Sequence, residues 1–286
     1  MSQARRSPAG RSRPDYSRDV DTPSPLALTI AGSDPSGGAG LQGDINVFSR
    51  HGLRTSAVVT ALTVQSGRGV VKSEAVPPSL VQEQLERVLT DHRVGGAKVG
   101  MLALGETVAA VAAAWKRLGG TAPLVVDPVL RSSSGTALLD PGGVDLLREE
   151  LLPLATVITP NLDEAAALLG RMSLGVSEAE EAARDLLEMG PKAVVLTGGH
   201  APGSGPVRDV VCCASGEVVF LEGSRIDTEH DHGTGCLLSA GIVSALVLGA
   251  SVLEAVEHGR RCVRRGLESG CEGAVWLDQA PEPIWL

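Results

Sequence analysis

The chain has 286 residues, of which 43% are hydrophobic, enough for a sizeable core in one large α/β domain. Its formal net charge of −9, without a large basic block, argues against nucleic acid as the principal partner. Three Trp, two Phe and one Tyr stand against 35 Gly, which favours close-packed layers of helix on sheet over an aromatic-cored β-sandwich. A small anionic substrate would then need a local positive site.

Cysteine usage and the N-terminal composition bear on the compartment. The five cysteines, at positions 212, 213, 236, 262 and 271, are odd in number, and two are adjacent, which favours a reduced cytoplasm. Residues 1–25 carry five Arg with Ser and Pro but no apolar core, so we expect a disordered tail, not a secretory signal. We expect residues 26–286 to form a single domain. The longest apolar run, Cys236–Ala250, is shorter than the roughly 20 residues of a membrane span, so no membrane partner is expected.

Short apolar runs alternate with helical periodicity along the rest of the chain. Such runs are typical of buried parallel strands, which are covered on both faces. We expect strands at Leu26–Ala31, Thr55–Leu62, Ala97–Gly100, Leu124–Val129, Thr156–Thr159 and Ala193–Thr197, and a hairpin at Val207–Leu221. We expect helices at Leu41–His51, Leu80–Leu89, Glu106–Leu118, Val144–Leu152, Glu164–Leu169, Ser177–Met189, Thr234–Leu248 and Val252–Glu268. This alternation predicts a three-layer α/β/α sandwich with a mostly parallel central sheet.

A glycine-rich turn, Gly32–Gly43, follows the first expected strand. Ligands bind at the carboxyl ends of strands in such a sheet, and Gly38–Gly43 matches the dinucleotide pattern G-x-G-x-x-G. That pattern needs its first glycine at the strand end and an acidic residue about 20 positions later. Gly38 lies six positions after Gly32, and no acid follows the second strand before Glu74. A nicotinamide cofactor is therefore disfavoured, and no P-loop sequence occurs.

A second glycine turn, Gly233-Thr234-Gly235-Cys236, runs into an apolar helix. A helix that begins at such a turn offers free backbone N–H groups and the positive end of its dipole, which together make an anion site. In the first helical turn a thiol pKa of about 8.5 can fall toward neutrality, so Cys236 could accept a proton from an attacking hydroxyl. The alternative is a glycine-bent turn beside a buried structural cysteine.

Two other groups also have alternative interpretations. Asn161 and Glu164 lie three residues apart at a helix start, which puts both on one face, but the same spacing forms a capping box. His230, His232 and Cys236 have the side-chain types of zinc ligands. A fourth ligand is not evident, and this disfavours zinc.

The chain resembles the hydroxymethylpyrimidine kinase/phosphomethylpyrimidine kinase family of thiamine biosynthesis, a branch of the ribokinase-like superfamily. The resemblance is carried by the motifs LTIAGSDPSGGAGLQGD (28–44), TALTVQ (60–65), AKVGML (97–102), DPVL (127–130), ITPNLDEAAALL (158–169) and HGTGC (232–236). It implies an enzyme that uses ATP and Mg²⁺ to phosphorylate 4-amino-5-hydroxymethyl-2-methylpyrimidine and then its monophosphate. It also implies a ribokinase-like fold and a homodimer.

The resemblance also assigns roles to individual residues. Cys236 would be the catalytic base, and the amides of Gly233, Thr234 and Gly235 would cover the transferring phosphate. Asp127 and Glu164 would serve the metal. The substrate pyrimidine would contact Asp44 and Gln65 at its polar edge and Gly32, Ala39, Met101 and Val129 at its faces and methyl group. ATP would be bordered by Asp127, Asn161, Glu164, Thr197, Gly199 and Thr234.

Several positions depart from the family pattern, namely Ser66, Gly67, Leu130, Ser133, Thr197, His230 and Asp231. We hypothesise that Arg131 supplies positive charge where many relatives carry a lysine near Ser133. The departures leave open a pyridoxine/pyridoxal kinase, which phosphorylates a similar hydroxymethyl group. A pyrimidine-binding regulator with weak catalysis is disfavoured, because Asn161, Glu164 and the Gly233 turn are all present.

Overall fold

The computed structural model describes residues 24–67, 69–132, 135–199 and 205–282. The expected tail therefore lies almost wholly outside the described residues, and Ser133, one of the positions that depart from the family pattern, also lies outside them. Within the described part of the chain a nine-stranded sheet has the order β3-β2-β1-β4-β5-β6-β7-β8-β9. The strands are β1 Leu26–Ser33, β2 Arg54–Ser66, β3 Gly69–Ala75, β4 Val94–Val99, β5 Leu124–Val126, β6 Val157–Ile158, β7 Ala193–Leu196, β8 Val207–Cys213 and β9 Val218–Gly223.

The six strands from β2 to β7 in this order run parallel. At one edge β3 pairs antiparallel with β2, and at the other β8 pairs antiparallel with both β7 and β9. The buried runs of β1 and β5 explain the apolar sequences, since both faces of the sheet are covered. All carboxyl ends of the parallel strands lie at one edge, and the polar and glycine-rich sequences that follow β1, β5, β6 and β7 gather there.

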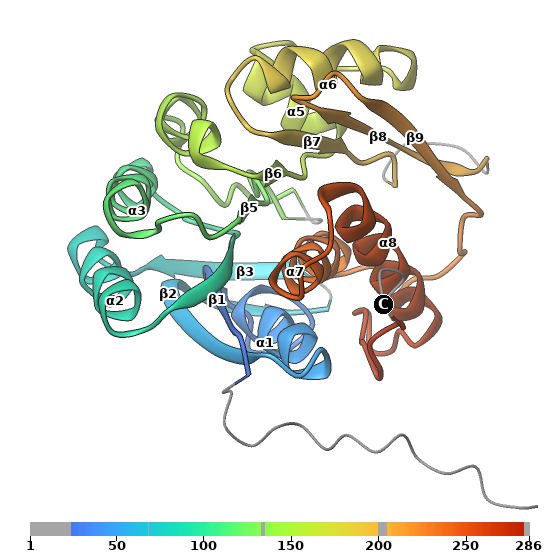
Figure 1. Ribbon diagram of the computed structural model, residues 1–286. Coiled ribbons are helices and arrows are strands. Elements are labelled where there is room, and N and C mark those ends of the chain that lie inside the picture. Colours follow the sequence, from blue (N-terminus) through green and yellow to red (C-terminus); the bar gives the residue numbers. More distant parts are fainter. Residues whose placement is uncertain (1–23, 68, 133–134, 200–204, 283–286) are drawn as a thin grey trace, which may run out of the picture.

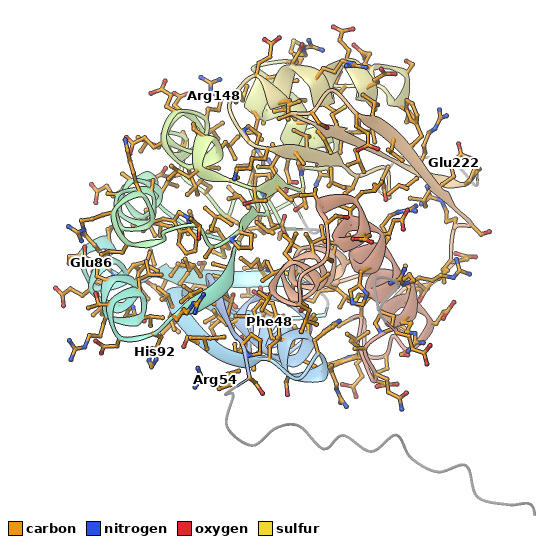
Figure 2. The ribbon with its side chains drawn as sticks, in the orientation of Figure 1. Phe48, Arg54, Glu86, His92, Arg148 and Glu222 are labelled. Atoms are coloured by element: carbon orange, nitrogen blue, oxygen red, sulfur yellow. The ribbon has the colours of Figure 1, made fainter. Side chains whose placement is uncertain are left out.

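Helices cover both faces of the sheet, as Figure 1 shows, with α1, α7 and α8 on one face and α2, α3, α5 and α6 on the other. Their bounds are α1 Gly40–Arg50, α2 Pro78–Asp91, α3 Gly105–Leu118, α4 Gly143–Leu146, α5 Leu162–Leu169, α6 Ala179–Leu187, α7 Thr234–Val247 and α8 Val252–Glu268. Phe48 is fully buried between α1 and the sheet, while Glu222 and His92 point outward (Figure 2). The expected three-layer α/β/α sandwich is confirmed, and none of the described helices is both long and apolar enough to cross a bilayer.

Two elements differ from the sequence expectations. β3 was not expected; it pairs antiparallel with β2 and its residues are mostly exposed, so it lacks the apolar run of a buried strand. The helix expected at Val144–Leu152 begins as the short α4 and continues as a π-helical turn, Leu147–Leu151. Pro153 follows Leu152, and a proline cannot donate an N–H to continue the helix.

Candidate active site

The two glycine turns, Gly32–Gly43 and Gly233–Cys236, are in direct contact. A Cβ atom at Gly233 would lie 2.0 Å from the carbonyl oxygen of Gly38, and Gly233 has φ of 93°, so only glycine suits this position. The backbone N–H of Gly40 donates a hydrogen bond to the Cys236 thiol. The Nε2 atom of His232 lies 3.0 Å from the Asp34 carboxylate. The loop after β1 and the start of α7 therefore form one structure.

The expected substrate residues lie around this junction. The side chain of Gln65, at the end of β2, hydrogen-bonds Asp34 in the first glycine turn, which puts Gln65 and Cys236 on the same side of the sheet edge. The Met101 sulfur packs over Gly32, where a Cβ atom would approach it to 3.0 Å. Ala39 is buried at the start of α1, and Val129 is partly exposed beyond β5.

Asp44 lies in the interior, below the surface of the junction. It is fully buried, and its carboxylate contacts the Lys98 ammonium at 2.6 Å and accepts a hydrogen bond from the Thr29 hydroxyl at 2.5 Å. Lys98 is equally buried, and although burial lowers its pKa, the neighbouring acidic groups of Asp44, Cys236 and Asp127 raise it overall. Lys98 is therefore a fixed positive charge beneath the candidate catalytic cysteine.

The pKa of Cys236 differs from the expectation. Burial of the thiol, reinforced by the nearby carboxylates of Asp44 and Asp127, raises its pKa to about 11, although Lys98 and the Gly40 amide oppose this shift. The lowered pKa inferred from the helix start alone is therefore wrong. A helix N-terminus stabilises a thiolate, but desolvation and two neighbouring carboxylates outweigh that effect here.

Asp127 and Glu164 form the acidic side of the site. Asp127 is buried at the end of β5, accepts a hydrogen bond from Ser239 in α7 at 3.2 Å and faces Gly235. Burial and the charge of Asp127 raise the pKa of Glu164 to about 8. Two neighbouring buried carboxylates repel each other, and a cation between them would relieve this repulsion. Asp127 and Glu164 therefore suit Mg²⁺, which prefers oxygen ligands.

Asn161 and Glu164 also form the capping box that the sequence left open. The Glu164 N–H donates to Asn161 Oδ1 at 2.9 Å, and the Asn161 N–H donates to Glu164 Oε2 at 3.0 Å. One Glu164 oxygen is thus used at the start of α5. A carboxylate has about four acceptor sites, so the cap does not prevent a second role for Glu164.

The remaining expected nucleotide residues follow the neighbouring strands. Thr197 continues β7 and pairs with Asn161 across the sheet edge, and its N–H donates to the Pro160 carbonyl at 2.9 Å. Gly199 is exposed, and its carbonyl accepts a hydrogen bond from Arg225 at 2.8 Å. The N-cap of α7, Gly233, makes no side-chain cap hydrogen bond, and the Thr234 N–H donates to the Asp231 carbonyl at 3.2 Å.

The zinc interpretation does not fit the arrangement of its three residues. His232 bonds Asp34, and His230 Nδ1 accepts a hydrogen bond from the Gly273 N–H at 3.0 Å. Among the described residues, the His, Cys and acidic side chains that gather closely enough for a metal are instead His51, His258 and Cys262, between α1 and α8.

Two residues of the candidate site, Lys98 and Asp34, are not among those predicted from the sequence. Lys98 lies inside the motif AKVGML, and a lysine within the apolar strand β4 is itself a signal, because a buried charge requires a partner. Asp34 was passed over within the glycine-rich turn. An aspartate near a turn is so often a local cap that its spacing gave no indication of long-range partners.

The family assignment rests on comparison with known proteins. The sequence model of the phosphomethylpyrimidine kinase family matches residues 34–275, a span that includes most of the first glycine turn and all of the second. The chain belongs to the phosphomethylpyrimidine kinase family. Within this family, the hydroxymethylpyrimidine/phosphomethylpyrimidine kinase of Rhizobium meliloti (strain 1021) is 46% identical over 233 residues, which cover 81% of this chain and 86% of that protein.

Solved structures agree with membership of the phosphomethylpyrimidine kinase family. The crystal structure of phosphomethylpyrimidine kinase from Clostridium difficile 630 has a TM-score of 0.73 at 34% identity and covers 84% of this chain and 98% of that one. Pyridoxal kinase from Staphylococcus aureus, in complex with AMP-PCP and pyridoxal, has a TM-score of 0.79 at 27% identity and covers 92% and 96% respectively. The fold is therefore that of the ribokinase-like vitamin kinases.

Proposed function

We propose that this chain transfers a phosphoryl group from ATP to the hydroxymethyl group of 4-amino-5-hydroxymethyl-2-methylpyrimidine and then phosphorylates the monophosphate to the diphosphate. The observation that carries this function is the junction of the two glycine turns around Cys236 in a member of the phosphomethylpyrimidine kinase family. ATP use is supported by the AMP-PCP complex of the related S. aureus kinase.

The protein's own groups suit phosphoryl transfer, which depends mainly on positioning and charge neutralisation. In the proposed reaction the substrate hydroxyl attacks the γ-phosphorus, its proton passes to the Cys236 sulfur, and ADP leaves. The amides of Gly233, Thr234 and Gly235 orient the transferring group at the start of α7. Lys98 offsets the negative charge that Cys236 gains on losing its own proton.

Mg²⁺ and the nucleotide have distinct proposed places. Asp127 and Glu164 would hold Mg²⁺, directly or through water, and bound Mg²⁺ would neutralise charge on the phosphates. Thr197, Gly199, Asn161 and Thr234 would border the nucleotide. This placement is supported by their common position at the carboxyl edge of β6 and β7 and at the start of α7.

The substrate would lie against Gln65 and between the side chains and backbone of Gly32, Ala39, Met101 and Val129. Asp44 is proposed to interact with the polar edge of the pyrimidine from the interior side of the site. Its bonds to Lys98 and Thr29 keep its carboxylate oriented. The experiment that tests the function is a side-by-side assay of ATP-dependent phosphorylation of hydroxymethylpyrimidine, its monophosphate and pyridoxal. We expect the kcat/KM for each of the two pyrimidines to exceed the kcat/KM for pyridoxal. A higher kcat/KM for pyridoxal would overturn the proposal.

Pyridoxal phosphorylation is the second candidate, favoured by one observation. The S. aureus pyridoxal kinase superposes over 92% of the chain, more than the C. difficile enzyme does. Identity points the other way, at 27% against 34%. The same assay ranks the two substrates directly.

We further propose that the chain forms a homodimer and works in a reducing cytoplasm. All five cysteines are free, which suits such a compartment. The β2–β3 hairpin exposes Leu62, Val64 and Val71, a set of apolar side chains that a second copy would cover. Analytical ultracentrifugation should give twice the chain mass, and Val71→Asp should shift the sample toward monomer; a parent that sediments as a monomer at assay concentration would refute the dimer.

A further inference from the structure

Asp34 is a fully buried carboxylate in the first glycine turn and gathers donors from three parts of the chain. Its Oδ1 atom accepts from the Ser36 N–H at 2.8 Å and the Ser36 hydroxyl at 2.7 Å. Its Oδ2 atom accepts from the Ala39 N–H at 2.9 Å and lies 3.0 Å from His232 Nε2. The side chain of Gln65 completes the set. If Asp34 only stabilised its own turn, it would bond Ser36 and Ala39 alone, whereas it also bonds His232 and Gln65.

The charge of Asp34 fixes the direction of each of these bonds. Burial alone would raise its pKa, but the hydrogen bonds from His232, Ser36 and Gln65 lower it to about 2, so the group is ionised at neutral pH. An ionised carboxylate only accepts hydrogen bonds. Gln65 must therefore turn its amide nitrogen toward Asp34, because the opposite orientation would place the amide oxygen against the carboxylate. His232 must likewise carry its proton on Nε2.

This orientation determines what Gln65 can offer a ligand. One N–H is engaged by Asp34, which leaves the amide oxygen as an acceptor and the second N–H as a donor. An amide that presents an acceptor beside a donor pairs with a ring nitrogen that lies next to an exocyclic amino group, as glutamine does with adenine. The 4-aminopyrimidine edge has that pattern, whereas the ring nitrogen of pyridoxal has a methyl-bearing carbon beside it.

We propose that Asp34 is a positioning residue that fixes the orientation of the Gln65 amide, and that it thereby selects heterocycles with an amino group next to a ring nitrogen. The same carboxylate also bonds His232, which directly precedes Gly233, so it connects Gln65 to the second glycine turn. The inference rests on the proposed function, since it explains how that site would prefer an aminopyrimidine over a hydroxypyridine.

The test measures binding by calorimetry with hydroxymethylpyrimidine and with its analogue that lacks the 4-amino group, without nucleotide. The parent should bind the amino compound at least tenfold more tightly than the analogue. Asp34→Asn keeps the shape but adds a donor that competes with Gln65, so this ratio should fall to within about threefold. On a Gln65→Ala background, Asp34→Asn should change the ratio less than twofold.

Asp140→Asn is the matched control, because Asp140 also holds a loop by accepting a backbone hydrogen bond, from Gly105 at 3.1 Å, away from the two glycine turns. It should leave the ratio unchanged. If Asp34→Asn fails to fold, Gln65→Asn tests the same contact with Asp34 intact, since its shorter side chain loses the reach and should lower the ratio equally. An unchanged ratio in the folded variant, or equal weakening of both ligands, overturns the inference. Absence of ATP-dependent product from the parent instead overturns the proposed function.

Discussion

At the scale of single residues, Cys236 is held with a raised pKa of about 11 beside a buried lysine. A base with this pKa is protonated at neutral pH, so it must lose its own proton before it can accept one from the substrate. The reaction should therefore speed up with rising pH until the thiol is ionised. Because the environment raises the pKa of the Cys236 thiol, the thiolate is a strong base once it has formed.

Replacement of Cys236 tests this role. Cys236→Ser keeps the size but removes the proposed base, so kcat should fall by about 10²–10⁴-fold, while ATP affinity, which we propose to depend on backbone amides, should change little. Cys236→Asp should retain more activity than Cys236→Ser and lose the alkaline rise of the parent. Steady-state kinetics across pH 6–9 with nucleotide binding by calorimetry measure both. If Cys236→Ser turned over at the parent rate at every pH, Cys236 would not be the base, and catalysis would rest on the turn amides and the metal alone.

Glu164 offers a test of the metal site because its two roles separate. Glu164→Gln preserves the capping geometry through the amide oxygen but removes the charge, so thermal stability should change little while turnover falls at limiting Mg²⁺ and partly recovers in excess Mg²⁺ or Mn²⁺. Since the carboxyl group has a pKa of about 8, a cation must displace its proton below that pH. The Mg²⁺ concentration for half-maximal activity in the parent should fall by up to about tenfold per pH unit as pH rises toward 8. Glu164→Gln should flatten that trend, and unaltered metal dependence would return Glu164 to a capping role.

At the scale of elements, α1 and α8 meet through a pair of imidazoles. The Nε2 atoms of His51 and His258 lie 2.7 Å apart, and His51 Nδ1 lies 2.7 Å from the Val47 carbonyl. The Arg261 guanidinium is 3.0 Å from His258 Nδ1, and the Cys262 sulfur is 4.0 Å from His51. The carbonyl requires a proton on His51 Nδ1 and the guanidinium requires a bare His258 Nδ1, so His258 Nε2 donates to His51. Both rings are neutral in this arrangement.

This pair predicts a loss of stability in acid. Burial, with the neighbouring His51 and the charge of Arg261, lowers the pKa of His258 to about 3, whereas an unfolded histidine has a pKa of about 6.5. Between these values the unfolded state binds a proton that the folded state refuses, so the free energy of unfolding should fall by up to about 1.4 kcal/mol per pH unit as pH drops from 6.5 toward 3. Urea unfolding at pH 7, 6 and 5 measures this slope. His258→Asn should reduce it and the exposed His92→Gln should not; equal slopes in all three proteins would contradict the assignment.

The sequence anticipated the elements whose signal is local. The strands β1 and β5 were recognisable because a strand covered on both faces must be apolar throughout, and the α7 start because a glycine turn precedes it. The edge strand β3 was missed because an exposed strand has no such composition. The direction of the Cys236 pKa shift was missed for a different reason. Lys98, Asp44 and Asp127 come from other elements, and their distances to the thiol are set by the fold.

At the scale of the whole molecule, the segment after α8 packs against the first glycine turn. Ala274 pairs with His232, and Trp276 packs on Gly37, where a Cβ atom would lie 3.0 Å from the indole ring. A Cβ atom at Gly38 would lie 2.5 Å from the Ala274 Cβ. Residues near the two ends of the described chain thus support the same site.

The contact between Gly38 and Ala274 can be tested by introducing a steric clash with one substitution and removing it with a second. Gly38→Ala should lower both kcat/KM and the melting temperature, because two methyl groups cannot occupy positions 2.5 Å apart. Ala274→Gly removes the opposing methyl, so the double variant Gly38→Ala/Ala274→Gly should recover most of both quantities. Kinetics and differential scanning calorimetry on the three variants give the coupling between the sites. Additive losses in the double variant would show that the two residues act independently.

The packing of Ala274 and Trp276 on the turn after β1 also has a consequence for synthesis. A ribosome makes β1 before the segment that holds Ala274 and Trp276, at about 5–20 residues per second, so the glycine turn emerges many seconds before the residues that hold it. Closing so long a loop makes this contact a late step of folding. A nascent chain would have most of its sheet formed while its two glycine turns were still unsupported. Kinase activity should therefore arise only after the segment with Ala274 and Trp276 has left the exit tunnel.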